Sequence, residues 1–100
     1  MSEIEITSKE TDDEEMDYEA LVRYVNRSTY RVRVLKDLSE SNAKIPRDIA
    51  HDCDILQNHI SNVLTDLRKR GLLEILNPEF HKGRLYRLSD EGRDIIKDLK

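Results

Sequence analysis

The sequence has little of what secreted proteins and large enzymes use. Its 100 residues include no tryptophan, five aromatic side chains and one cysteine, Cys53. A lone cysteine cannot form a disulfide within the chain, and the sequence shows no signal peptide and no apolar run of about 18 residues. We therefore expect a cytoplasmic protein with no membrane segment. The chain makes one small domain, too short for the large pockets of two-layer enzymes.

Catalytic and metal-binding motifs are missing as well. No Ser, His and acid stand in a nucleophile motif, and the glycines form no phosphate loop. We predict that the protein is not an enzyme. His51, Asp52, Cys53 and Asp54 carry ligand-type side chains, but a soft-metal site needs two or more thiolates or paired histidines. The single thiol favours a core role for Cys53 over metal or redox sensing, and we expect no cofactor.

Charge divides the sequence into two segments of opposite sign. Residues 1–17 hold eight acids against one base and only four apolar side chains. This composition predicts a disordered acidic arm over residues 1–16 and a folded domain over residues 17–100. Residues 18–100 hold sixteen bases and thirteen acids, a net charge of +3. Three roles stay open for the arm: a solvated tail, a competitor for the basic surface of its own domain, or a docking segment for a protein partner.

Hydrophobic periodicity predicts three helices in the first half of the domain. The first covers about residues 17–26, and the second covers about residues 29–39 with Ser28 as its N-cap. After a polar loop, Pro46 suits the first turn of a short helix that reaches about Asp52.

A fourth, longer helix shows two distinct faces. We expect Asp54 to cap its start and Gly71 to end it in the C′ position. At about 100° per residue, the apolar side chains gather on one side: Leu56, Ile60, Val63, Leu64 and Leu67. The opposite side gathers amides, a hydroxyl and a cation: Asn58, Asn62, Thr65 and Lys69.

Beyond Gly71 the period changes to that of strands. Residues 72–76 and 84–88 are short and rich in β-compatible side chains, and residues 77–83 between them contain turn formers, which predicts a hairpin with a long tip. Ser89 is the expected N-cap of a last helix with an apolar stripe of Ile95, Ile96 and Leu99. The predicted fold is mainly α with a small β-hairpin.

Four separate motifs carry a family resemblance over about residues 20–95. They are Tyr30-Arg31-Val32-Arg33-Val34-Leu35, Ile49-Ala50 with Ile60-Ser61-Asn62-Val63-Leu64 and Leu67, Gly71-Leu72-Leu73-Glu74, and Gly83-Arg84-Leu85-Tyr86-Arg87-Leu88-Ser89-Asp90-Glu91-Gly92. They resemble winged helix-turn-helix transcriptional regulators of the ArsR-like, archaeal type. The resemblance implies a three-helix core, a two-stranded wing, a C-terminal helix, and sequence-specific binding of double-stranded DNA. A winged-helix module that docks on protein without reading DNA is the alternative.

The DNA-binding hypothesis assigns two groups of residues. The amide-rich start of the long helix supplies candidates for base edges in the major groove, because Asn and Gln pair bidentately with adenine: Gln57, Asn58, His59, Ser61 and Asn62. Candidates for phosphate or wing contacts are Lys44, Arg47, Thr65, Arg68, Lys69, His81, Lys82 and Arg84. Arg31 falls among apolar residues of its helix, so we expect it to form a salt bridge inside the fold.

The first and last helices predict a homodimer. Each carries an apolar stripe that one 83-residue body is not expected to bury fully, and small domains gain core by pairing. The predicted interface comprises Tyr18, Leu21, Val22, Val25, Ile95, Ile96 and Leu99.

Overall fold

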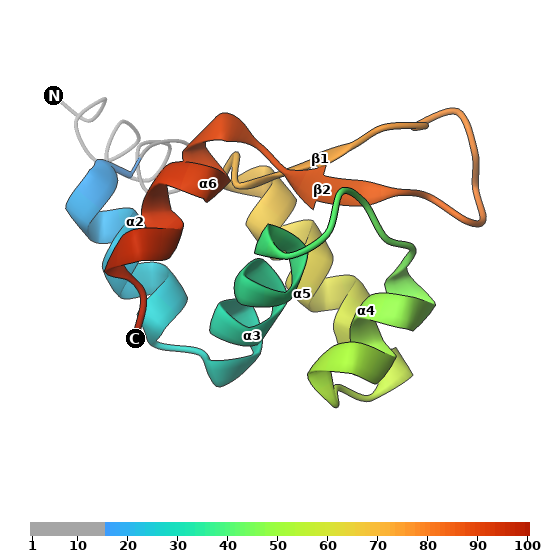
Figure 1. The fold of residues 1–100 in the computed structure, drawn as a ribbon, viewed down its shortest axis with the longest axis horizontal. Helices are drawn as coiled ribbons and strands as arrows, with labels where there is room; N and C mark the ends of the chain where they lie inside the picture. Colours follow the sequence, from blue (N-terminus) through green and yellow to red (C-terminus); the bar gives the residue numbers. More distant parts are fainter. Residues whose placement is uncertain (1–15) are drawn as a thin grey trace, which may run out of the picture.

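Five α-helices and a two-stranded antiparallel hairpin make up residues 16–100, the part of the chain that the structure, a computed structural model, describes (Figure 1). The elements are α2 (Tyr18–Asn26), α3 (Thr29–Ser39), α4 (Pro46–Cys53), α5 (Gln57–Lys69), β1 (Leu73–Ile75), β2 (Tyr86–Leu88), α6 (Asp90–Ile95) and the 3-10 helix η1 (Ile96–Asp98). The predicted order of helices and hairpin is confirmed. The predicted acidic arm lies outside the described residues, apart from Met16.

Local capping fixes where three of the helices begin. The Ser28 hydroxyl accepts the Arg31 N–H at 3.3 Å, and the Ser89 hydroxyl accepts the Gly92 N–H at 3.1 Å, which confirms both predicted N-caps. Asp17 caps α2 in the same way, accepting the Ala20 N–H at 2.9 Å. A side chain of this kind satisfies one backbone donor that the first helical turn leaves unpaired, and each such cap stabilises the fold by about 1 kcal/mol.

The junction between α4 and α5 differs from the sequence prediction. Asp54 does not cap α5; it ends α4 in the left-handed conformation, with φ 59°. Leu56 occupies the N-cap position of α5, in extended backbone and without a side-chain cap. Because Leu56 precedes the helix, its side chain does not join the apolar face and is 64% exposed, whereas Ile55 is buried in the core. The placement of Leu56 in the core was therefore wrong.

The inner face of α5 forms the centre of the core. Ile60, Leu64 and Leu67 are almost completely buried and pack with the buried residues of α3 and α4. Gly71 ends the helix as predicted, with φ +80°. Its N–H donates to Arg68 O at 2.9 Å and the Leu72 N–H donates to Leu67 O at 3.0 Å, the paired bonds of a Schellman motif. The chain thereby turns directly from α5 into the hairpin.

The hairpin is shorter than predicted and has a neighbour that the sequence did not indicate. β1 and β2 pair antiparallel with Leu73 opposite Leu88 and Ile75 opposite Tyr86. Lys44, in the loop before α4, exchanges two backbone hydrogen bonds with Tyr86, of 3.0 and 2.9 Å. This bridge fixes the base of the hairpin against the helical body. Figure 1 shows the hairpin projecting at the same end as α4, away from α2 and the C-terminus.

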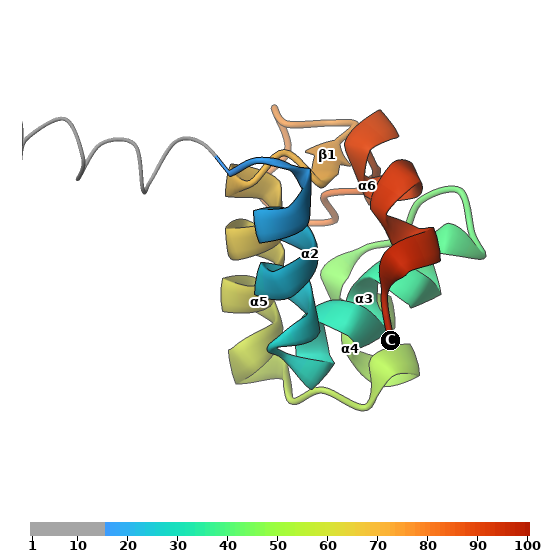
Figure 2. The same cartoon turned by 90° about the vertical axis from the view of Figure 1, so that its left-hand side faces the viewer.

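The terminal helices α2 and α6 pack on each other within one chain (Figure 2). Val25 and Ile95 are buried in the chain's own core, so the prediction that they contact a second copy is wrong. The packing of α6 against the hairpin and α2 closes this part of the core around them. Four other predicted interface residues are half-buried against the same core: Leu21, Val22, Ile96 and Leu99. Tyr18 is 43% exposed. No helix within residues 16–100 is long and apolar enough to cross a membrane.

Candidate nucleic-acid interface

The outer face of α5 presents polar side chains to solvent. Gln57, Asn58, Ser61 and Asn62 are all exposed. Within the described part of the chain, none of these four side chains makes a hydrogen bond to another residue. Because the inner face of the helix is held in the core, the amides are carried by a fixed backbone. The structure therefore brings four of the five predicted base-reading residues together on one free surface.

His59, the fifth predicted base reader, has a neighbour within the fold. Its ring centroid lies 6.1 Å from that of Tyr30 on α3, with the ring planes tilted by 46°. On the helical wheel it falls on the flank of the polar face rather than at its centre. His59 stays exposed, so it borders the amide surface and also contacts α3.

The end of α5 carries cations beside α2. Arg68 and Lys69 are exposed, as a phosphate contact requires. Arg70 lies with its guanidinium carbon 5.2 Å from the centre of the Tyr24 ring. Thr65, one turn earlier, is half-buried. The basic end of the helix is thus anchored to α2 by one arginine, while two neighbouring cations face solvent.

Arg31 pairs inside the fold, but not through the predicted salt bridge. Its guanidinium carbon lies 3.7 Å from the centre of the Tyr24 ring, and Nη1 donates to the Tyr24 carbonyl at 2.7 Å. The face of the Tyr24 ring attracts the Arg31 cation in place of the carboxylate that a salt bridge would have supplied. The prediction failed on the partner because Tyr24 lies on the preceding helix, and sequence spacing alone does not show which helices face each other.

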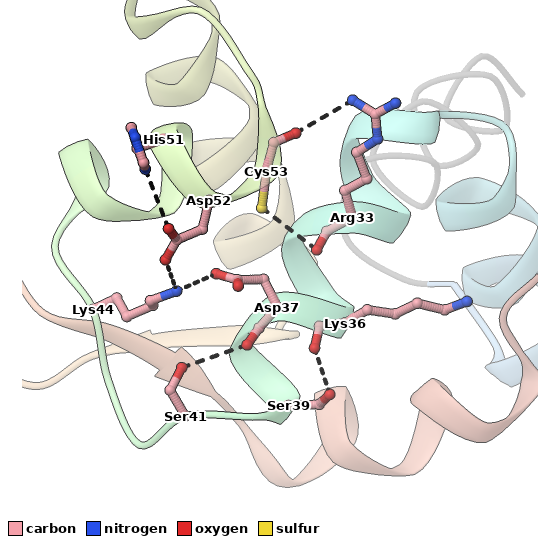
Figure 3. Close-up of polar contacts among 9 residues, drawn as sticks. All are labelled: Arg33, Lys36, Asp37, Ser39, Ser41, Lys44, His51, Asp52 and Cys53. Atoms are coloured by element: carbon pink, nitrogen blue, oxygen red, sulfur yellow. Dashed lines mark hydrogen bonds and ion pairs between the residues drawn. The ribbon is translucent and has the colours of Figure 1, made fainter.

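Lys44 is held between two carboxylates (Figure 3). Its Nζ lies 2.8 Å from Asp37 Oδ2 and also pairs with the Asp52 carboxylate. Burial lowers the pKa of Lys44, but the hydrogen bonds to Asp37 and Asp52 outweigh it, so that the pKa is raised above its usual value. The hydrogen bond from Lys44 lowers the pKa of Asp52. Lys44 is therefore occupied within the protein, whereas Arg47 near the start of α4 is exposed.

Cys53 is a buried core residue, as predicted. Its Sγ donates to the Arg33 carbonyl at 3.5 Å, and Arg33 Nη1 donates to the Cys53 carbonyl at 3.3 Å (Figure 3). Burial raises the pKa of the thiol to about 11, so the reactive thiolate is scarce at neutral pH. Among residues 16–100, no three His, Cys, Asp or Glu side chains are grouped so that they could hold a metal ion.

His81 and Lys82, in the hairpin tip after the turn at residues 78–79, are both exposed to solvent. Gly83 follows with φ +70°, a conformation that favours glycine. Arg84, also predicted to contact DNA, instead hydrogen-bonds two backbone carbonyls of the loop, those of Phe80 and Pro78.

Two exposed apolar side chains, one before α5 and one in the hairpin loop, were not predicted as contacts. Leu56 precedes the amide-rich run of α5, and Phe80 lies in the tip of the hairpin with 53% of its surface exposed. The sequence could have indicated the exposure of Leu56, because a helix that starts at Gln57 leaves Leu56 outside the helix and off its apolar face. For Phe80 the indication was its place in a loop of turn-forming residues, because such a loop has no core in which a large ring can be buried.

Comparison with known proteins supports the fold assignment. No family model matches the sequence, and no curated protein matches it. Among solved structures, the chain is similar to the MarR family transcription regulator SP03579, with 26% identity over 77% of this chain and 56% of that one and a TM-score of 0.60. It is also similar to a MarR family transcriptional regulator from Silicibacter pomeroyi, with 21% identity over 81% and 57% of the two chains and a TM-score of 0.64.

A third similar structure is that of NadR in complex with 4-hydroxyphenylacetate. Identity is 21% over 97% of this chain and 67% of NadR, with a TM-score of 0.65. The chain spans little more than half the length of the first two proteins. The fold of residues 16–100 is thus the winged helix of transcription regulators, with α3, α4 and α5 as its helical core and the β1–β2 hairpin as its wing.

Proposed function

We propose that the protein is a transcription regulator that binds double-stranded DNA with sequence preference. In this proposal α5 lies in the major groove and the wing, residues 77–84, lies against the minor groove or its flanking phosphates. The observation that supports it best is the outer face of α5, where exposed amides without internal partners stand on a helix whose other face is locked in the core. Fold similarity to transcription regulators supports the same role.

The proposed contacts divide by chemistry. Base edges are read by the exposed polar residues of α5 and by its flanking histidine: Gln57, Asn58, His59, Ser61 and Asn62. Phosphates are contacted by exposed or half-exposed donors on α4, α5 and the wing: Arg47, Thr65, Arg68, Lys69, His81 and Lys82. Lys44 leaves this set because two carboxylates occupy its ammonium group, and Arg84 leaves it because its guanidinium is bound to the wing loop.

A homodimer that uses α2 and α6 belongs to the proposal in a narrower form. With Val25 and Ile95 buried, the interface would consist of Tyr18 and the half-buried Leu21, Val22, Ile96 and Leu99. Sedimentation equilibrium of the wild-type chain from low to high micromolar concentration tests this directly. A monomer throughout that range would remove the dimer from the proposal.

The structural neighbours are MarR regulators, and the ArsR-like affiliation and cytoplasmic location stay predictions from the sequence.

A protein-docking role is the alternative function. The exposed Leu56, Leu76 and Phe80 favour it, because apolar exposure marks protein interfaces as well as DNA wedges. A contiguous exposed amide face on α5 favours DNA. An acidic arm that binds a protein partner is compatible with either role.

Selection from a pool of random-sequence DNA duplexes at low and at physiological salt tests the proposal. We expect enrichment of a defined sequence, with an affinity that falls as salt rises because phosphate contacts release counterions. The Asn58→Ala and Asn62→Ala variants should lose the enrichment, while Asn42→Ala, which removes one exposed amide from the loop before α4, is the matched control and should keep it. Absence of binding to any duplex at low salt would overturn the proposal in favour of protein docking.

A further inference from the structure

The wing loop is tied together by its first residue. Asn77 Oδ1 accepts the Leu85 N–H at 2.8 Å, and Asn77 Nδ2 donates to the Gly83 carbonyl at 3.2 Å. The Asn77 carbonyl also accepts the Phe80 N–H at 3.0 Å. One residue thus joins both sides of the loop and starts its turn, so the tip has a defined shape although it projects from the body.

Arg84 completes this arrangement from the other side of the loop. Its Nε donates to the Phe80 carbonyl at 2.5 Å, and its Nη2 donates to the Pro78 carbonyl at 3.2 Å. The planar guanidinium suits this two-point contact, which the single ammonium group of a lysine cannot reproduce with the same geometry. Arg84 therefore holds the backbone on each side of residue 79 and fixes the backbone position from which the Phe80 side chain projects.

The loop so fixed leaves a phenyl ring in solvent. Phe80 is 53% exposed and is followed by the exposed His81 and Lys82. Phe80 is one of four large apolar side chains that remain exposed in residues 16–100, with Tyr18, Leu56 and Leu76. A single exposed apolar residue needs no explanation, but here the hydrogen bonds of Asn77 and Arg84 order the segment that exposes it.

We propose that Phe80 is an apolar wedge that enters the minor groove and partly separates two stacked base pairs, and that Arg84 is the positioning residue that holds it for this role. This inference rests on the proposed function. With α5 in the major groove, the hairpin that follows it lies beside the next groove along the duplex, which is the minor groove. Apolar side chains inserted there unstack a base step and kink or unwind the duplex.

The charges around Phe80 favour DNA over a protein as the occupant. Lys82 lies two residues away and is exposed, and its ammonium group suits a phosphate that flanks the groove. Residues 77–84 hold one acid, Glu79, directly before Phe80, against two bases, Lys82 and Arg84. The ring thus stands in a loop whose charged side chains are net positive, an arrangement that fits a polyanion with an apolar interior.

A topoisomerase relaxation assay on a closed circular plasmid tests the wedge without knowledge of the binding sequence. We expect the wild-type protein to change the linking number of the relaxed plasmid, and Phe80→Ala to abolish that change. Affinity of this variant for a mixed-sequence 30-base-pair duplex should fall by about tenfold or less, because phosphate contacts remain. Phe80→Leu keeps an apolar wedge and should retain most of the change.

Arg84→Lys tests the positioning role separately from the charge. If Arg84 acts through the loop, this variant should lose the linking-number change as Phe80→Ala does, should show faster amide hydrogen exchange over residues 78–83, and should keep the salt dependence of binding. Lys82→Ala is the contrasting variant. It should lower the slope of log affinity against log salt by about 0.9 and leave the linking-number change in place.

The outcomes separate this inference from the proposed function. Binding of wild type with no change in linking number, or an unaltered change in Phe80→Ala, would overturn the wedge alone. Exchange rates in Arg84→Lys equal to those of wild type would overturn the positioning role. Failure of wild type to bind the duplex at low salt would overturn the proposed function, and the wedge with it.

Discussion

The two ends of the molecule differ in whether their polar side chains hydrogen-bond within the protein. At the end formed by α2, α6 and η1, polar groups bind one another: the Tyr18 hydroxyl donates to Asp94 O at 3.3 Å and to the Asp98 carboxylate, and Asn26 Oδ1 accepts the Lys100 N–H at 3.0 Å. At the other end, the amides of α5 have no partner within the described residues. Exposed amides are satisfied by water, so they cost the fold little and remain available to a ligand.

The largest expected effect contrasts the two faces of α5. Leu64→Ala on the buried face removes packed methyl groups and leaves a cavity, which should lower the free energy of unfolding by about 2–5 kcal/mol. Asn62→Ala on the outer face should change it by about 0.5 kcal/mol or less. Urea titration followed by circular dichroism measures both. A large loss of stability in Asn62→Ala would mean that the outer face is structural.

The second prediction concerns sequence preference. Asn58→Ala or Asn62→Ala should weaken binding to the selected duplex by about 1–3 kcal/mol and change binding to random duplex little, because an amide removed from a base edge removes discrimination. Fluorescence anisotropy on the two duplexes measures the difference. An equal loss on both would show that these amides contact the backbone rather than the bases.

A smaller effect is expected from the cap of α6. The Ser89 hydroxyl accepts the Gly92 N–H and donates to the Gly71 carbonyl at 2.6 Å. Ser89→Ala should therefore destabilise the fold by about 1–2 kcal/mol, because the Gly71 carbonyl and the N–H of Gly92 both lose their partner. DNA affinity of the folded variant should be unchanged. A thermal melt and an anisotropy titration on the same sample separate the two quantities.

The smallest effect comes from the half-exposed Lys44 network. The lowered pKa of Asp52 contributes stability that is present above its ordinary value of 3.8 and is lost as the pH falls through the lower, folded-state pKa. The raised pKa of Lys44 contributes stability that is present below 10.5 and is lost as the pH rises through the folded-state pKa. The stability difference between wild type and Lys44→Met should thus be largest between these limits and shrink outside them. A difference that does not vary with pH would contradict the ionic account.

Sequence reasoning succeeded where the deciding contacts are local. Ser28, Ser89 and Gly71 act on backbone groups within a few residues, so their capping roles could be predicted from type and position. The amide face of α5 followed from helical period alone. These features place the exposed amide face without any knowledge of tertiary packing.

Contacts between distant segments could not be predicted in the same way. The backbone bridge from Lys44 to Tyr86 joins residues 42 positions apart, and the buried positions of Val25 and Ile95 depend on which helices cover them. Asp54 failed as a cap of α5 for a different reason: an aspartate suits both a helix start and a left-handed helix end, and composition does not distinguish the two.

Titration of isotopically labelled protein with the selected duplex, followed by nuclear magnetic resonance, tests the central claim most directly. The side-chain amide signals of Asn58 and Asn62 and the backbone signals of residues 78–83 should shift on binding, while those of α2 and α6 should stay in place apart from any change in oligomeric state. Shifts concentrated on α2 and α6, with the α5 amides unaffected, would contradict the assignment of the outer face of α5 as the DNA-reading surface.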